Sequence, residues 1–214
     1  MSTITVYGVN TSRTLRVHWT LQELGISYQT KPIRSRSRQT QTAEYAAINP
    51  GCKIPSLRDG ELIVSESAAI CIYLAEKYSN ETLIPIADSV KRARFFQVCF
   101  YTMTELDAHT LYIIAKHGGG LVQYYQPSSV AVDVAIAGFN RQILVANSWL
   151  DSNSYILGET FTVADILMCT CLISATKLAV QFPLKIPHRL KTYAETLQTR
   201  SAFQIAQTAN HLQA

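Results

Sequence analysis

The segment from Asn49 to Tyr78 constrains the fold more than any other part of this chain. It contains an Ile54-Pro55 step, and a bond before proline is where a cis peptide is energetically accessible. An Asp59-Gly60 pair follows between apolar stretches, with Leu62 to Val64 on its far side, which is typical of a two-residue hairpin. The run from Ala68 to Tyr78 then favours a helix. The segment therefore predicts a proline turn, a β-hairpin and a helix in immediate succession.

The start of this helix, Ser65-Glu66-Ser67, has two interpretations. In the first, Ser65 is an N-cap and Glu66 complements the helix dipole. In the second, the unpaired N–H groups of the first turn receive a ligand carboxylate. A cis bond at Ile54-Pro55 turns backbone groups outward, where the main chain of a ligand can pair with them. The combination favours a site that holds a peptide.

This segment resembles the glutathione-binding half of the glutathione S-transferase family, whose pattern reads roughly NP-x-G-K-V-P-x-L-x-D-x-x-x-L-x-E-S-x-A-I-x-x-Y-L. The matching residues are Asn49, Pro50, Lys53, Pro55, Leu57, Asp59, Glu66, Ser67, Ala69, Ile70, Tyr73 and Leu74. In that family the residue before the cis-proline pairs its backbone with the cysteine of glutathione, and the Glu-Ser pair receives the γ-glutamyl end. The resemblance gives these roles to Ile54-Pro55, Glu66 and Ser67. Lys53, beside the proline turn, is suited to a glutathione carboxylate.

The resemblance extends over nearly the whole chain. The string LGETFTVADILM matches the family's G-x-x-x-T-x-A-D-I signature, and IPHRLKTYAETLQTRSAF resembles its P-x-L-x-x-Y and R-P-A-F endings, with Ser201 in place of the usual proline. Thr162 and Asp165 also stand at the cap and third positions of a helix start. We therefore interpret these two residues as structural rather than catalytic.

The pattern of elements predicts an α/β domain followed by an all-α domain. The resemblance implies a thioredoxin-like βαβαββα domain and an all-helical C-terminal domain, the glutathione S-transferase fold. The expected limits are 1–79 for the first domain, 80–88 for a linker and 89–214 for the helical domain. The expected elements of the first domain are strand Ile4–Tyr7, helix Leu15–Leu24, strand Ser27–Ile33, and the hairpin and helix above. The helical part is broken at Gly118–Gly120, Asn153 and Pro183–Pro187.

The chemistry is expected in the loop from Gly8 to Thr14, between the first strand and the first helix. No cysteine precedes Cys52, so this loop cannot exchange a dithiol. Thr11 and Ser12 instead place two hydroxyls at a helix N-terminus. A free thiol with a pKa of about 8.5 is only a few per cent ionised at neutral pH. A hydrogen bond from a hydroxyl, together with the helix dipole, can lower that pKa by about one to two units.

The resemblance to serine-type family members implies that one of these hydroxyls donates a hydrogen bond to the sulfur of glutathione. The string S-R-x-x-R-V-x-W resembles fungal and bacterial members and favours Ser12, and Thr11 is the other candidate. A plain N-cap is the alternative role of Ser12. Tyr7 is expected to pack within its strand.

A second-substrate pocket is predicted from a stripe on the long helix after Arg94. Solvent or a dimer partner is the alternative to a cleft as the surface that this stripe faces. The residues at three-to-four-residue spacing are Tyr101, Glu105, His109, Tyr112 and Lys116, and the predicted pocket residues are Asn10, Tyr101, His109 and Tyr112.

The composition argues against several other classes of protein. The net charge is only +4, and the one basic run, Lys31 to Arg38, is expected to be a solvated loop, so no nucleic-acid partner is predicted. Five cysteines at irregular spacing suggest free thiols, and no C-x-x-C or H-E-x-x-H set predicts a metal site. No apolar stretch approaches 18 residues, and the N-terminus lacks a signal-peptide layout. We expect a cytoplasmic protein with no membrane segment.

These observations predict a glutathione transferase that joins glutathione, as co-substrate, to a hydrophobic electrophile. The family resemblance also implies a two-fold homodimer. One alternative is a glutathione-dependent peroxidase or disulfide-bond reductase, because the thiol of Cys52 is expected near the glutathione site. Cys52 occupies the position where the family usually has glycine, and Gly51 lies one place earlier. Another alternative is a non-catalytic binding protein, because this fold also hosts members that no longer catalyse.

Overall fold

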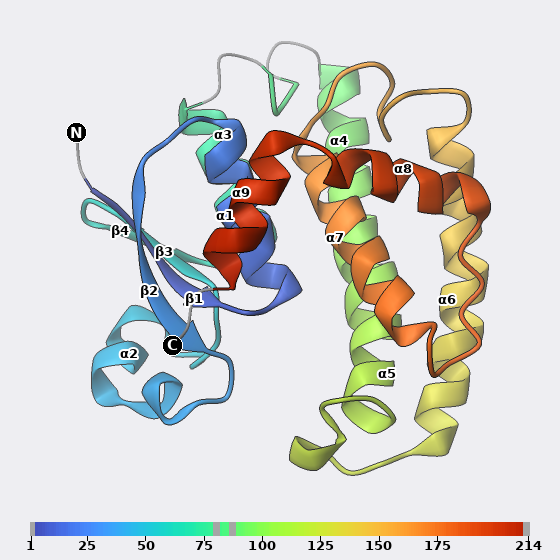
Figure 1. Cartoon of the computed structure of the whole chain (residues 1–214), viewed down its shortest axis with the longest axis horizontal. Coiled ribbons are helices and arrows are strands. Elements are labelled where there is room, and N and C mark those ends of the chain that lie inside the picture. The colour runs from blue at the N-terminus through green and yellow to red at the C-terminus, as the bar shows by residue number, and fades with distance from the viewer. Residues whose placement is uncertain (1–2, 79–81, 86–88, 212–214) are drawn as a thin grey trace. The chain divides into compact units, whose positions relative to one another are not determined.

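The computed structural model describes residues 3–78, 82–85 and 89–211 and consists of two compact units (Figure 1). The first unit comprises Met1–Ile84 together with Gln198–Ala214, and the second comprises Pro85–Leu197. Most of the expected linker, 80–88, lies outside the described residues. The expected domain limits therefore stay a prediction.

The first unit is built on a four-stranded sheet with the order β2-β1-β3-β4. β1 and β2 are parallel, whereas β3 pairs antiparallel with β1 and β4. The turn of the β3–β4 hairpin uses Gly60 at a φ of 60°, a conformation that glycine adopts without steric cost. The elements are β1 (Ile4–Val9), α1 (Ser12–Glu23), β2 (Tyr28–Arg34), η1 (Arg38–Gln41), α2 (Ala43–Ile48), β3 (Ser56–Asp59), β4 (Leu62–Ser65) and α3 (Ser67–Tyr78).

This order of strands and α-helices is βαβαββα, so the thioredoxin-like fold predicted from the sequence is confirmed. The core of the sheet consists of fully buried side chains such as Val6 and Leu57. α1 contributes Trp19 and Leu21, and α3 contributes Leu74. α1 is buried on all sides from Thr14 to Leu21, because it packs against α3, α9 and β1.

The last helix, α9 (Ser201–Asn210), belongs to the first unit because it packs along α1 (Figure 1). The ring of Phe203 meets the ring of Trp19 edge-on, with 4.9 Å between centroids. Arg200 binds both carboxylate oxygens of Glu23, at 2.6 and 2.8 Å. The C-terminal end of the chain therefore completes the core that the first strands begin.

The second unit is a bundle of helices, and the described residues contain no strand there, only an isolated bridge between Tyr155 and Gly158. Its core includes Phe95, Leu106 and Phe139, all fully buried. The elements are α4 (Ser89–Tyr101), η2 (Thr102–Leu111), α5 (Tyr112–His117), η3 (Val122–Tyr124), α6 (Ser129–Leu150), α7 (Val163–Leu178) and α8 (His188–Gln198). The all-helical second part predicted from the sequence is confirmed.

The start of α7 has the capping box that the sequence predicts. The Asp165 carboxylate accepts hydrogen bonds from the N–H and the hydroxyl of Thr162, at 2.8 and 3.0 Å. The same carboxylate also accepts hydrogen bonds from the Ile156 N–H and the Tyr193 hydroxyl. Asp165 is fully buried, and these four donors account for its presence in the core.

α6 is long and apolar enough to cross a membrane by length and composition alone. This is weak evidence for a membrane segment, because core helices of water-soluble folds pass the same test. The buried side chains of α6 recur at helical spacing and pack against η2 and α5. They are Val132, Ala135, Phe139, Ile143, Ala146 and Leu150.

Candidate functional site

The loop between β1 and α1 contains two hydroxyl groups that differ in their hydrogen bonding. Thr11 is the N-cap of α1, and its Oγ1 accepts a hydrogen bond from the Thr14 N–H at 3.0 Å. The Thr14 hydroxyl in turn accepts one from the Thr11 N–H at 3.0 Å, which completes a capping box. Ser12 is the first helical residue, so its alternative role as N-cap is wrong. Its hydroxyl is half-buried and has no hydrogen-bond partner among the described residues.

Asn210, at the end of α9, holds this loop through three hydrogen bonds. Its backbone carbonyl accepts from the Asn10 N–H at 2.8 Å, and its Oδ1 accepts from the Thr14 hydroxyl at 2.6 Å. Its amide nitrogen donates to the carbonyl of Thr11 at 3.2 Å. Asn210 is buried, so these bonds are shielded from water. The loop is thereby fixed by the two ends of the chain together.

The other side of the loop lies directly against the proline turn. Gly8 has a φ of 123°, and a Cβ added to it would lie 2.7 Å from the Cβ of Ile54. Only glycine therefore allows the two backbones to approach this closely. The carbonyl of Gly8 lies 3.2 Å from Nε2 of His18, and Nδ1 of His18 lies 3.0 Å from the Tyr28 hydroxyl.

Burial lowers the pKa of His18 to about 4, so the imidazole is neutral at pH 7. A carbonyl can only accept a hydrogen bond, so Nε2 carries the proton and donates to Gly8. Nδ1 then accepts from the hydroxyl of Tyr28. The neutral ring thus joins α1 to the end of β1 and to the start of β2.

The Ile54-Pro55 peptide bond is cis, as the sequence predicts. The preceding carbonyl, of Lys53, accepts hydrogen bonds from the Tyr45 hydroxyl and the Asn49 amide, each at 2.8 Å. Outside the strands, the N–H and C=O of Ile54 have no hydrogen-bond partner among the described residues. The turn therefore holds Ile54 firmly and leaves its main chain available for another chain to pair with.

Cys52 precedes this turn in the left-handed region, with a φ of 52°. This conformation favours glycine, which explains physically why the family pattern has glycine there. The Cys52 N–H donates to the Asn49 carbonyl at 2.9 Å, and its half-buried thiol lies 3.7 Å from the Pro50 carbonyl. The ammonium group of neighbouring Lys53 is exposed and has no partner within the described part of the chain.

α3 begins at Ser67, one residue before the run from Ala68 to Tyr78 that the sequence favours as a helix. Ser65 is the last residue of β4 and pairs with Ser56, so the interpretation of Ser65 as an N-cap is wrong. Glu66 precedes the helix at a φ of 69°, and its carbonyl accepts from the Ile70 N–H at 2.9 Å. Its side chain is exposed. With Ser65 as the N-cap the helix would begin at Glu66, but it begins at Ser67 because Ser65 still pairs with Ser56 at the end of the β3–β4 ladder.

Ser67 is buried, and its hydroxyl accepts a hydrogen bond from the Arg16 guanidinium at 3.2 Å. Arg16 comes from α1 and is itself almost completely buried. It brings a positive charge to the N-terminus of α3, where the helix dipole also favours an anion. α1 thus supports both the hydroxyl loop and the start of α3.

The predicted second-substrate residues lie in both units. Asn10 belongs to the hydroxyl loop of the first unit, at a φ of 64°. In the second unit, the Tyr101 hydroxyl donates to Gln142, and its ring packs edge-on against Trp149. The side chain of His109 is 72% exposed. The Tyr112 ring lies 5.3 Å from the ammonium of Lys116, which also lies 4.5 Å from the Tyr125 ring.

The α-helical spacing behind this predicted stripe does not hold along its whole length. η2 is a π-helix, and the Tyr112 N–H donates to the carbonyl of Asp107, five residues back. A π-helical segment shifts every later side chain around the helix axis relative to an α-helix. Tyr101 and Tyr112, on either side of η2, accordingly contact different groups.

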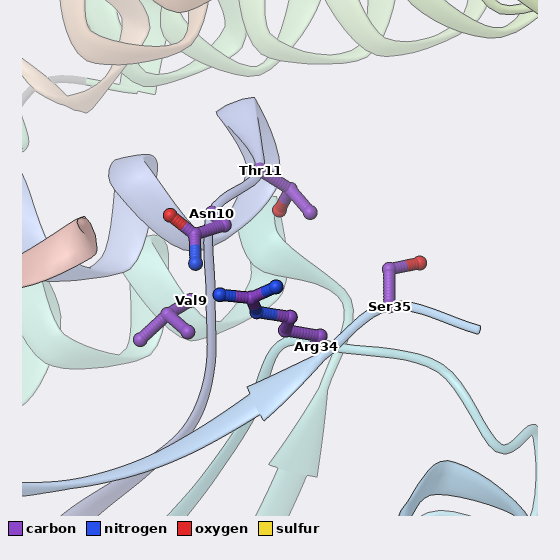
Figure 2. Close-up of a pocket in the computed structure, with 5 residues that line it drawn as sticks. All are labelled: Val9, Asn10, Thr11, Arg34 and Ser35. Atoms are coloured by element: carbon purple, nitrogen blue, oxygen red, sulfur yellow. The ribbon is translucent and has the colours of Figure 1, made fainter. Parts of the chain in front are cut away.

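A cavity of about 360 Å³ lies beside the hydroxyl loop, entirely within the first unit. Figure 2 shows Arg34 reaching from the end of β2 towards Asn10 and the start of α1. The cavity is lined by Val9, Asn10, Thr11, Arg34 and Ser35.

Comparison with known proteins identifies the family. The profile of the glutathione S-transferase N-terminal domain matches residues 12–77. Glutathione S-transferase hmp2 of Hypomyces subiculosus is 32% identical over 170 residues, which cover 76% of this chain and 78% of that protein. The chain belongs to the glutathione S-transferase family.

Two further relatives define the extent of the likeness. The glutathione transferase URE2P6 of Phanerochaete chrysosporium, solved in complex with oxidized glutathione, has a TM-score of 0.81 at 20% identity, covering 98% of this chain and 96% of that chain. Elongation factor 1-gamma of Prunus avium is 29% identical over 181 residues, 84% of this chain. This glutathione S-transferase family member spans only 42% of that elongation factor.

In this family member, the sequence missed three residues that the structure places at the site. Arg16 and Arg34 lie in segments with a recognisable pattern, but only the fold shows that one is buried under Ser67 and the other lines a cavity. Asn210 is separated from Thr14 by 196 positions, and no local signal connects them. Among the described residues, no cluster of three or more His, Cys, Asp or Glu side chains could hold a metal ion.

Proposed function

We propose that this protein is a glutathione transferase, which joins the sulfur of glutathione to an electrophilic small molecule. The observation that supports this most is the half-buried hydroxyl of Ser12, which lacks a partner in the described structure. It stands at the start of α1, at the end of the loop in which Gly8 lies against the side chain of Ile54. A thiol held by Ile54 would therefore lie next to a free hydrogen-bond donor.

Glutathione is placed in this proposal by three groups of the first unit. The main chain of Ile54 pairs with the cysteine residue of glutathione. Glu66 and Ser67, at the start of α3, receive the γ-glutamyl end, with the buried Arg16 beside Ser67 favouring its carboxylate. The exposed ammonium of Lys53 meets the glycyl carboxylate.

The chemical role of Ser12 is to stabilise the thiolate. Its O–H donates a hydrogen bond to the sulfur, and the N-terminus of α1 adds a favourable dipole. A hydrogen bond to a charged group contributes about 1.5 to 3 kcal/mol, which corresponds to roughly one to two pKa units. The proton of the thiol passes to solvent, the sulfur forms a bond to the electrophilic carbon, and the leaving group departs with its electron pair. Thr11 is a poorer candidate because its hydroxyl already caps α1.

The test is to replace Ser12 by Ala and to measure turnover and glutathione affinity separately. We expect kcat/KM to fall about ten- to hundredfold, because one hydrogen bond to the thiolate is lost, while the Kd for glutathione changes little. Ultraviolet absorbance of the bound thiolate across pH should show its pKa shifted upward in the variant. Ser12→Thr, which keeps a hydroxyl, is the matched control.

Unchanged turnover in both Ser12→Ala and Thr11→Ala would refute the proposed role of this loop.

Glutathione-dependent peroxide or disulfide reduction is the second candidate, because the thiol of Cys52 is half-exposed just before the proline turn. That reading requires Cys52→Ser to abolish the reduction. Failure to bind millimolar glutathione would favour a non-catalytic protein, a reading that the likeness to an elongation factor also supports.

A further inference from the structure

Arg34 is a cation without a partner in the described structure, and it lines the cavity beside the hydroxyl loop (Figure 2). It is the last residue of β2 and pairs in register with Val9, the last residue of β1. Its side chain is exposed, and none of its guanidinium donors is used by another described residue. The five N–H donors of this planar guanidinium group are therefore available to a ligand in the cavity.

No acidic residue lies close to Arg34 in the sequence. Between Glu23 and Glu44 the sequence has no acidic residue, whereas the run from Lys31 to Arg38 carries four basic residues. The other cavity residues are an amide, two hydroxyl residues and a valine. No carboxylate of the lining can satisfy the guanidinium. A ligand with a carboxylate or a phosphate group would supply that missing charge, and guanidinium binds either in a bidentate manner.

The order of strands separates this cavity from the groups proposed to hold glutathione. β1 lies between β2, which carries Arg34, and the β3–β4 hairpin, which lies between the proline turn and Glu66. Glutathione bound to Ile54, Glu66 and Ser67 would occupy the hairpin side of β1. Lys53 is available there for its glycyl carboxylate. The cavity is lined by the end of β1 and by the loop that leads to Ser12, so a second reactant held there would lie beside the proposed thiolate site.

We propose that Arg34 determines the choice of the second substrate by selecting electrophiles that carry a carboxylate or phosphate group. This inference rests on the proposed transferase function. The glutathione sulfur would form a bond to the electrophilic carbon, and the leaving group would depart with its electron pair. The anionic group itself would not react; Arg34 would hold it and so orient the carbon towards Ser12.

A matched pair of probes tests this directly: 4-chloro-3-nitrobenzoate and the neutral 4-chloro-3-nitrobenzamide. In both, sulfur displaces chloride from the ring carbon, so a carbon–sulfur bond forms as a carbon–chlorine bond breaks. Each kcat/KM is divided by the uncatalysed rate of the same probe. We expect Arg34→Gln to lower the benzoate-to-benzamide ratio roughly five- to tenfold, since the pair with an exposed arginine is partly screened by water.

Arg38→Gln is the control, because Arg38 belongs to the same basic run but does not line the cavity. It should leave the ratio unchanged, and the KM for glutathione should be the same in all three proteins. Added salt should lower the wild-type ratio, because it screens exposed charges. An equal loss for both probes in Arg34→Gln, or a raised KM for glutathione with the ratio intact, would overturn the inference.

A binding measurement separates failure of this inference from failure of the proposed function. Calorimetry with 3-nitrobenzoate and 3-nitrobenzamide needs no turnover. Tighter binding of the benzoate that is lost in Arg34→Gln but kept in Arg38→Gln would support the anion site even if neither chlorinated probe reacts, and only the transferase proposal would then fail. Equal Kd values for the two compounds in the wild-type protein would refute the role of Arg34, whatever the turnover.

Discussion

At the scale of single residues, His18 makes the stability of the first unit depend on pH. The folded protein holds this imidazole neutral with a pKa of about 4, whereas an unfolded chain protonates it near 6.5. Between about pH 4 and pH 6.5 the unfolded state therefore binds a proton that the folded state does not bind. The contribution of the neutral His18 to the free energy of unfolding is complete above pH 6.5 and is lost as the pH falls towards 4. The full difference corresponds to about 3 kcal/mol.

The measurement is urea unfolding of wild type and His18→Gln at intervals from pH 4 to pH 8. Below pH 6.5 we expect the free energy of unfolding to fall more steeply for the wild type than for His18→Gln, because only the wild type carries the His18 imidazole. Carboxyl groups titrate in both proteins, so their effect cancels in the difference. His109→Gln is the control, since its side chain is 72% exposed. Parallel curves for the wild type and His18→Gln would show that His18 is not responsible.

At the scale of elements, the start of α1 depends on the end of α9. Asn210→Ala removes the acceptor of the Thr14 hydroxyl and the donor to the Thr11 carbonyl, both buried or half-buried groups. We expect a loss of about 1 to 3 kcal/mol of unfolding free energy, since buried polar groups are left unpaired. Asn210→Asp keeps an acceptor for Thr14 but turns a carboxylate oxygen, which cannot donate, towards the Thr11 carbonyl, so it should also lower the stability. Chemical denaturation measures both, and equal stability of Asn210→Ala and the wild type would contradict the predicted linkage.

The same elements show why part of the site was predictable. The capping box of α7 was expected because Thr162 and Asp165 match a local pattern whose geometry the helix start dictates. The box of α1 was not, because Thr14 is an unusual residue at the third position. The hairpin and the cis bond also follow from neighbouring residues. The π-helix η2 and the burial of Arg16 depend on packing against distant segments, which no local pattern encodes.

At the scale of the whole molecule, the last helix packs on the first, and the ring of Phe203 on α9 contacts the ring of Trp19 on α1. Both side chains are fully or almost fully buried. Phe203→Ala leaves a cavity beside the indole and should cost about 3 to 5 kcal/mol. Ile205→Ala, on the same helix but 55% exposed, should change stability by about 0.5 kcal/mol or less.

The chain has two tryptophans, so a Trp149→Phe background leaves Trp19 as the reporter of the first unit. Urea titrations followed by Trp19 fluorescence should then show an earlier transition for Phe203→Ala than for Ile205→Ala. Because Asn210 follows Phe203 on α9 and holds the hydroxyl loop, the Phe203 variant should also bind glutathione more weakly at urea concentrations where the first unit begins to open. Coincident transitions for the two variants would show that the first unit does not need α9 for its stability.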